Sequence, residues 1–349
     1  MKTFKLKIIT LAFGTVFLSS CTKLLYTSLD VLRPAKVAFN SDVNNILIIN
    51  NTVPQPADIG HSTLFAFEGL KKETFNTDSL SIFCLGALKE DIESKNFFSS
   101  VQLSPNSIST NTDFASANYI SDETVKAMCN STQADAIISL DKIKVKDQVT
   151  EVYDEIAGSY ISTLELNFES YWSIHYPNKE EFYALQFRDT VYWEAQSVSR
   201  KRGILVLPKR EDALVDGALY VGKNTVNRLV PYWDKVDRYF FNPNKKYFKQ
   251  AMDSVYVKNW NSAIAIWQTV IDQSKSNWTI AQAANNIAIA YEISGNLDKA
   301  LEYASVAFYN IQELSFADYN SFVRITDYVT ELMQRRKDMI ALKKQLDEK

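Results

Sequence analysis

The sequence predicts an α+β protein, in which an N-terminal α/β sheet domain with an antiparallel hairpin precedes an all-α, tetratricopeptide-like helical region. Three observations lead to this prediction. Apolar runs alternate with amphipathic helical stretches over residues 45–140, which is typical of strands joined by helices. Two longer stretches, 160–176 and 183–194, alternate apolar and polar residues, which predicts strands with one solvated face. From residue 245 to the end only helical periodicity remains.

The α/β part begins at 45–50 with a continuous apolar run flanked by asparagines, which suits a strand covered on both faces. Helical spacing follows over 77–92, and a short strand is predicted at 97–103. Ser121 caps the next predicted helix, whose first turn carries two acidic residues, and the strand after it is predicted at 134–140. The resulting order, βαβαβ, implies a layered core.

The turn between the two long strands is supplied by Pro177-Asn178-Lys179, so we expect an antiparallel hairpin added to the sheet. A helical stripe then runs over about 210–230, and Pro231 and Pro243 bracket a junction. The predicted parts are a leader at 1–20, an anchor and linker at 21–40, the α/β domain at 41–208, a helical junction at 209–243, helical repeats at 244–314 and a capping helix at 315–349.

The helical region resembles two degenerate tetratricopeptide repeats. Tyr291, Gly295 and Ala300 fall at the offsets of this repeat, and Trp260 and Ala263 take corresponding places upstream. Ala263 and Ala300 are 37 positions apart (300 minus 263), so an insertion of three residues in the period of about 34 is required. An unrelated pair of helical hairpins remains the alternative.

The N-terminus has the pattern of a bacterial leader peptide. Three lysines precede an apolar run, Ile8–Leu18, which is too short to span a bilayer. The following Leu18-Ser19-Ser20-Cys21 resembles a lipobox, and the resemblance implies cleavage before Cys21 and its modification by acyl chains such as palmitate. A plain secreted protein, or a buried Cys21, is the alternative. No acidic cluster resembling a surface-export signal follows, so we expect a lipid anchor on the periplasmic face of the outer membrane.

Charge and motifs exclude several functional classes. The formal net charge is −3, and it becomes −6 without the three leader lysines, which disfavours a nucleic-acid partner. Cys84 and Cys129 either form a disulfide or remain as two separately buried thiols. With only His61 and His175 besides them, no metal-ligand spacing exists. No metal site and no cofactor are therefore predicted.

Two motifs come close to catalytic patterns. The stretch 217–223 matches GxxxxGK, but Asn224 stands where the magnesium ligand belongs, and the helical periodicity favours glycines that serve close helix packing. Gly60-His61-Ser62-Thr63-Leu64 begins like a nucleophile elbow, but Leu64 replaces the second glycine. We therefore predict no nucleotide partner and no catalytic residue.

Taken together, the lipobox, the α/β half and the repeats resemble the uncharacterised DUF6340-type lipoproteins of Bacteroidetes. The resemblance extends over nearly the whole mature chain, and the junction at 229–239 carries it best. It implies no activity. The α/β half is also similar in pattern to small α/β domains of curli-secretion and TolB-type envelope lipoproteins.

Two functions fit these observations. The first is an envelope scaffold that binds another protein, with junction aromatics as contacts: Tyr232, Trp233, Tyr239 and Phe241. The same aromatics could instead pack two domains together. The second function is an envelope enzyme or small-ligand binder that uses a pocket in the α/β domain. A concave pocket with converging polar groups would favour the second.

Overall fold

The computed structural model describes residues 24–39, 42–65, 68–117, 119–179, 182–314 and 319–347. Cys21 and the predicted leader at 1–20 lie outside these residues. The chain divides into two compact units. Unit 1 contains the described residues of Met1–Val31 and Asp234–Lys337, and unit 2 contains those of Leu32–Trp233 and Asp338–Lys349.

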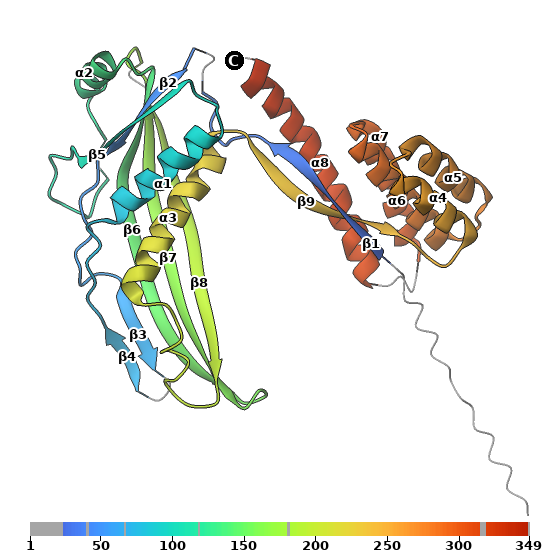
Figure 1. Ribbon diagram of the computed structural model, residues 1–349, viewed down its shortest axis with the longest axis horizontal. Helices are drawn as coiled ribbons and strands as arrows, with labels where there is room; N and C mark the ends of the chain where they lie inside the picture. The colour runs from blue at the N-terminus through green and yellow to red at the C-terminus, as the bar shows by residue number, and fades with distance from the viewer. Residues whose placement is uncertain are drawn as a thin grey trace, which may run out of the picture. The chain divides into compact units, whose positions relative to one another are not determined.

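Unit 2 is built on a seven-stranded sheet with the order β4-β3-β6-β2-β5, to which β7 and then β8 are added beside β6. Its strands are β2 (Asn45–Asn50), β3 (His61–Phe65), β4 (Gly69–Lys72), β5 (Ser100–Ser107), β6 (Ala136–Asp154), β7 (Ser159–His175) and β8 (Tyr183–Ser197). Its helices are α1 (Leu80–Ser94), α2 (Asp122–Thr132) and α3 (Arg210–Leu229). Figure 1 shows α1 and α3 side by side in front of the long strands β6 and β7.

The predicted α+β class is confirmed. β2 pairs in parallel with both β5 and β6, as the order βαβαβ requires, and β7 and β8 form the expected antiparallel hairpin. Two features were not predicted. β6 continues far beyond residue 140, and the short antiparallel pair β3 and β4 lies against its second half.

The two faces of the sheet carry separate apolar cores. Ile46 and Ile48 of β2 face a core that includes Cys84 of α1, whereas Leu47 and Ile49 face one that includes Cys129 of α2. The two cysteines therefore lie on opposite sides of the sheet, and both are free thiols. Burial raises the pKa of both thiols, that of Cys129 to about 11. The disulfide between Cys84 and Cys129 is thus wrong, and the two buried thiols are what the structure shows.

Glycines in α3 serve close packing, as the helical periodicity predicted. A Cβ atom added at Gly222 would lie 2.1 Å from the backbone oxygen of Cys84 in α1. A Cβ at Gly217 would lie 2.5 Å from the ring of Phe168 in β7. The GxxxxGK stretch is therefore the inner face of a helix and not a phosphate-binding loop.

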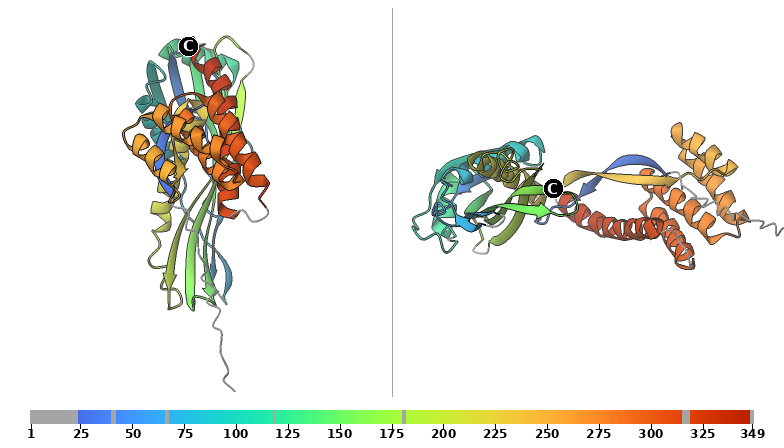
Figure 2. Two further views of the ribbon diagram at one scale, coloured as in Figure 1. Left: turned by 90° about the vertical axis from the view of Figure 1, so that its right-hand side faces the viewer. Right: turned by 90° about the horizontal axis from the view of Figure 1, so that it is seen from below.

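Unit 1 consists of a two-stranded sheet and successive helices (Figure 2). The strands are β1 (Leu24–Arg33) and β9 (Tyr232–Phe241), and the helices are α4 (Lys246–Tyr256), α5 (Trp260–Gln273), α6 (Asn277–Ile293), α7 (Leu297–Gln312) and α8 (Tyr319–Asp347). Each helix from α4 to α7 packs against the next. The last residues of β1, the first two of β9 and the end of α8 are counted with unit 2.

The junction differs from its prediction. Residues 209–243 are not helical throughout, because α3 ends at Leu229 and β9 follows after Pro231. Pro231 ends the helix as expected, but a proline is equally acceptable directly before a strand. The predicted linker at 21–40 likewise contains β1, the partner strand of β9.

The C-terminal half of β9 is fixed to the helices of unit 1. Phe240 is fully buried and stacks on Trp267 of α5 with ring centroids 5.7 Å apart. Asn286 of α6 accepts a hydrogen bond from the backbone N–H of Phe241 (2.8 Å) and donates one to its carbonyl oxygen (2.7 Å). An interior helix residue thus satisfies both backbone groups of one strand residue.

A buried ionic cluster ties β9 to α6 and α8. Arg238 makes two hydrogen bonds to Glu292, each 2.8 Å long, and the hydroxyl of Tyr328 donates a third (2.8 Å). Arg335 also contacts Glu292. Burial alone would raise the pKa of Glu292, but hydrogen bonding and charge from Arg238, followed by the charge of Arg335, outweigh it, and the pKa lies below its ordinary value.

We predict that Gly222→Ala destabilises unit 2, because the added methyl group overlaps the backbone of α1 and forces α1 and α3 apart. The expected loss is about 2 kcal/mol in the free energy of unfolding, measured by denaturant titration. Gly86→Ala, in α1, is the matched control, because nothing lies within 4 Å of a Cβ atom there. Equal effects of the two substitutions would contradict the close-packing role of Gly222.

Candidate functional site

The candidate site lies at the carboxyl ends of the parallel strands of unit 2. From β2 the chain passes through α1 to β5 on one side, and then through α2 to β6 on the other side of β2. The two helices cover opposite faces of the sheet, so the connections diverge at the end of β2. In open α/β sheets, ligands bind in the crevice that such a reversal of strand order creates.

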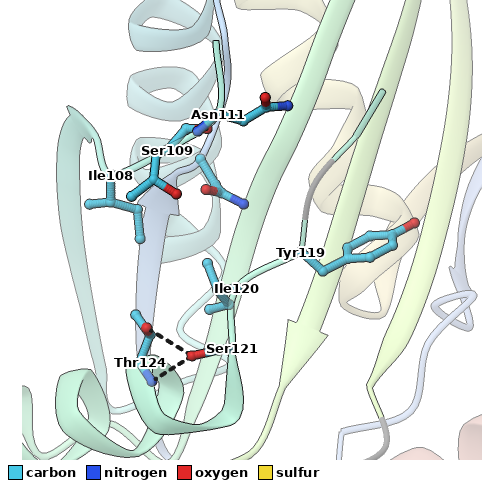
Figure 3. Close-up of a pocket in the computed structure, with 9 residues that line it drawn as sticks. Ile108, Ser109, Asn111, Tyr119, Ile120, Ser121 and Thr124 are labelled. Atoms are coloured by element: carbon cyan, nitrogen blue, oxygen red, sulfur yellow. Dashed lines mark hydrogen bonds between the residues drawn. The ribbon is translucent and has the colours of Figure 1, made fainter. Parts of the chain in front are cut away.

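A cavity of about 520 Å³ opens at this position. It is lined by the end of β2, the segment after β5 and the start of α2, with the residues Asn51, Ile108, Ser109, Thr110, Asn111, Tyr119, Ile120, Ser121 and Thr124. Figure 3 shows Ser109 and Asn111 near one end of the site and Ser121 and Thr124 near the other. None of the nine residues has a charged side chain.

Hydrogen bonds fix the segment that follows β5. The backbone N–H of Ile108 donates to the carbonyl of Asn50 (2.9 Å), and the hydroxyl of Ser107 donates to the carbonyl of Thr52 (2.7 Å). Further along, the side chain of Asn111 accepts from the backbone N–H of Asp113 and donates to its carbonyl, each at 3.0 Å. The wall that carries Ser109 and Asn111 is therefore a defined loop with its own turn.

The N-terminus of α2 is already occupied by its own side chains. Ser121 accepts a hydrogen bond from the backbone N–H of Thr124 (3.3 Å), as its predicted capping role requires. Bonding to its own backbone, and then to Ser121, lowers the pKa of Glu123, and Asp122 adds a second carboxylate in the first turn. An anionic ligand would meet these two charges, so the helix end does not offer a phosphate site.

Asp141 lies behind Asn51 and does not line the cavity; it begins a buried polar layer that we call the floor. The register between β6 and β7 shifts at this residue, which is a β-bulge, and its side chain is almost fully buried. Its Oδ1 accepts hydrogen bonds from Asn51 (3.0 Å) and from Ser139 (2.7 Å). Burial raises the pKa of Asp141, against the opposing effect of hydrogen bonds with Ser173, Asn51 and Ser139.

His175 continues this floor towards Tyr119. Its Nε2 lies 2.8 Å from the hydroxyl of Ser173, and its ring stacks on Phe182 with centroids 4.7 Å apart. Phe182 in turn contacts the ring of Tyr119, again at 4.7 Å. Burial lowers the pKa of His175 to about 4, although Asp122 acts in the opposite direction.

The arrangement of Asp141, Ser173 and His175 does not form a nucleophilic triad. Such a triad places the histidine between the acid and the serine, whereas here Ser173 hydrogen-bonds both Asp141 and His175. Ser173 is also fully buried. The three residues therefore support the cavity and offer no attacking group to a ligand.

His61, from the incomplete nucleophile elbow, lies away from this floor in a buried ionic cluster. It is the first residue of β3, and its Nδ1 contacts Asp147 of β6, which also contacts Arg210 at the start of α3. Arg210 donates a further hydrogen bond to the hydroxyl of Thr63 (3.0 Å). The cluster joins two strands and a helix. The described part of the chain contains no group of three or more potential metal ligands.

The junction aromatics divide into exposed and buried side chains. Trp233 is 68% exposed, and Tyr232 and Tyr239 are half-buried. Phe241 is fully buried and packs against Trp278 of α6, so its prediction as a partner contact is wrong. Successive side chains of β9 point to opposite sides of the strand, and only the end of the strand enters the helical core. Aromatic residues that are close in the sequence therefore have different surroundings.

None of the residues that line the cavity was predicted as a site residue, and Ser121 was predicted only as a helix cap. The available signal was the polar run at 107–112, Ser-Ile-Ser-Thr-Asn-Thr, together with Asn51 at the end of the buried strand. Such a run also describes an ordinary surface loop, so only the fold shows that it faces Asn51 and the start of α2.

Comparison with known families divides the chain near the end of β9. A model described as a domain of unknown function (DUF8603) matches residues 43–241, more than half of the chain. The chain belongs to the DUF8603 family. A second domain of unknown function (DUF6340) matches residues 249–334. The predicted DUF6340 resemblance is therefore confirmed for the helical part only, and the junction at 229–239 falls within the DUF8603 match.

Other comparisons add little. No curated protein matches the chain. One solved structure, described as the crystal structure of an uncharacterized protein, covers 54% of this chain and 93% of its own, with 7% identity and a TM-score of 0.23. A score of this size supports no statement about the fold. Among the residues that the structure describes, no helix is long and apolar enough to cross a membrane.

We predict that His175 makes unit 2 less stable as the pH falls from about 6.5 to about 4. In this window the unfolded chain binds a proton at His175 and the folded chain does not, so the free energy of unfolding falls with pH. His175→Gln should remove about 3 kcal/mol of this dependence, as measured by denaturant titrations across the window. Identical pH profiles for the two proteins would show that His175 is not held neutral.

Proposed function

We propose that unit 2 binds a small, uncharged ligand rich in hydrogen-bonding groups, of which a sugar is the simplest example. The observation that carries the proposal is the cavity at the reversal of strand order, lined by two asparagines, two serines, two threonines and one tyrosine, with Ile108 and Ile120 as the only apolar residues. Amides and hydroxyls both donate and accept hydrogen bonds, which matches the alternating groups of a polyhydroxylated ligand.

The electrostatics of the site favour a neutral ligand over a nucleotide or another anion. The lining contributes no positive charge, and the carboxylates of Asp122 and Glu123 stand at the one helix N-terminus in the lining. A phosphate would have to displace or approach these groups without a cationic partner. A neutral ligand meets no such penalty.

The lipid anchor is part of the same proposal. The lipobox ending at Cys21 supports acylation, and the absence of an acidic cluster after it in the sequence supports the periplasmic face of the outer membrane. The helices α4 to α7 support a tetratricopeptide-like unit, because Ala263, Ala288 and Ala300 are fully buried where such repeats need small residues. This unit would then be presented near a membrane surface.

A protein-binding scaffold is the second candidate. It is favoured by Trp233, whose side chain is 68% exposed, because tryptophan is enriched among the residues that contribute most of the binding energy at protein interfaces. Tyr239 is half-buried against Tyr26 and Phe241, and Tyr232 is also half-buried. These two side chains would contribute at most the edge of such a contact.

We predict that neutral saccharides raise the melting temperature of the protein and that sugar phosphates and nucleotides do not. Thr110→Trp should abolish this shift, because the indole fills the cavity from an exposed position. Thr112→Trp is the matched control, since Thr112 is exposed in the same loop but does not line the cavity. Stabilisation by phosphorylated ligands, or an equal response of both variants, would contradict the proposal.

We predict for the scaffold that Trp233→Ala removes proteins captured from crosslinked envelopes and leaves the melting temperature unchanged. Phe241→Ala should instead destabilise unit 1 by about 3–5 kcal/mol, because it empties a buried position. Retention of every captured protein by Trp233→Ala would remove the support for this second candidate.

A further inference from the structure

The strand β8 forms a long free edge of the unit 2 sheet. It has 15 residues, and β7 is the only described strand that pairs with it. The pairing with β7 continues from Tyr183 to Ser197 without a register shift, and Figure 1 shows β8 as the last of the long strands. No other described segment makes a backbone hydrogen bond to β8. The outward N–H and C=O groups of alternate residues are therefore available to another strand.

The other two edge strands of the sheet are protected against such pairing. β4 has four residues, and two of them are the exposed lysines Lys71 and Lys72. β5 contains Pro105, which has no N–H to donate to a neighbouring strand. Short length, lysine and proline are the usual means by which proteins prevent an edge from pairing. β8 is long and contains no lysine, proline or glycine, so it lacks this protection.

A row of alternating charges crosses the solvated face of the sheet and ends at β8. Lys144 of β6 lies opposite Glu169 of β7, and Glu169 lies opposite Arg188 of β8. The charged atoms are 3.6 Å apart in the first pair and 3.7 Å apart in the second. Opposite charges that face each other across neighbouring strands stabilise a sheet. A further strand would therefore continue the row if it placed a carboxylate opposite Arg188.

β8 itself contains such a carboxylate at a symmetrical position. Glu194 is exposed on the same face as Arg188, and no ion pair within the described ranges includes it. Arg188 and Glu194 each lie three positions from Val191. In an antiparallel pair of two β8 strands centred on Val191, each Arg188 therefore lies opposite Glu194 of the second copy.

The same register suits the neighbouring side chains of the solvated face. It places Tyr192, which is 67% exposed, opposite the exposed Thr190 of the second copy. Pairs of an aromatic and a β-branched residue are favourable across strands. A shift by one residue would set the solvated face of one copy beside the core face of the other. A shift by two residues would separate Arg188 from Glu194.

We propose that β8 pairs antiparallel with β8 of a second copy of the chain, with Val191 of both copies at the two-fold axis. This pairing covers the unprotected edge of both copies and joins their sheets into one. The occupant is a second copy because β8 is complementary to itself in charge, face and register. The inference does not depend on the ligand proposed for the cavity.

Disulfide crosslinking of the full chain, purified from envelopes, tests the register. Opposite Cα atoms of an antiparallel pair lie about 4.5–5.5 Å apart, a distance that a disulfide spans. Val191→Cys should therefore give a crosslinked dimer on oxidation. Gln186→Cys is the control, because Gln186 is more exposed than Val191 but lies ten positions from Gln186 of the second copy. Cys84 and Cys129 are buried, and the protein without an added cysteine gives the background.

A charge exchange tests the contact between the two copies, with the dimerisation constant measured by sedimentation equilibrium in detergent solution. Glu194→Arg should weaken dimerisation about tenfold, because two pairs of like charges replace two pairs of opposite charges. Adding Arg188→Glu to Glu194→Arg should restore dimerisation, whereas independent structural damage from the two substitutions would accumulate.

A protein that is monomeric at every concentration overturns the proposal. Equal crosslinking of Val191→Cys and Gln186→Cys also overturns it, because that result indicates random collision. A dimer that Glu194→Arg leaves unchanged does the same, since the two copies would then meet through another surface.

Discussion

Pairing along β6 determines the architecture of unit 2. The first residues of this strand pair in parallel with β2, residues 147–150 pair in parallel with β3, and almost the whole strand pairs antiparallel with β7. Because β2 pairs with β5, β3 with β4 and β7 with β8, each of the remaining strands attaches to β6 through one neighbour. The cavity lies where β2 ends, next to Leu140 of β6, whose carbonyl oxygen accepts a hydrogen bond from the backbone N–H of Asn51.

The bulge at Asp141 allows β6 to direct apolar side chains into the same core both before and after residue 141. Before it, even-numbered residues such as Ile138 and Leu140 face the core under α1 and α3, and after it odd-numbered residues such as Ile143 and Val145 do so. If the strand ran regularly through Asp141, with no bulge, the lysines at 142, 144 and 146 would point into that core. The irregularity also leaves Asp141 outside the ladder, where it hydrogen-bonds Asn51 at the cavity. The bulge that keeps the alternation of β6 in phase with the core therefore also provides the buried polar layer behind the cavity.

The predictable parts of the fold are those with a strong local pattern. Residues 46–49 are apolar throughout because both faces of β2 are covered, and the period-two alternation of β7 indicates that one of its faces is solvated. The second half of β6 alternates regularly from Lys142 to Val149, so its signal was present in the sequence and was missed, whereas β9 was missed because aromatics occupy both parities at its end. The cavity could not be predicted, since its walls come from residues 51 to 124 and only the crossing of α1 and α2 on opposite faces brings them together.

In unit 1 polar contacts determine the register of β9, because apolar burial alone permits more than one register. Tyr239, Phe240 and Phe241 are consecutive aromatics, so a slip of β9 by one residue would still place a ring in each apolar cluster. The paired hydrogen bonds between Asn286 and the backbone of Phe241, and the two between Arg238 and Glu292, exist in one register only. A slip would take Arg238 away from the buried Glu292 and leave its carboxylate with Arg335 and Tyr328 alone, and loss of one partner of a buried ion pair costs more than a misplaced ring. Buried polar residues in a helix rich in alanine therefore select the register of the strand.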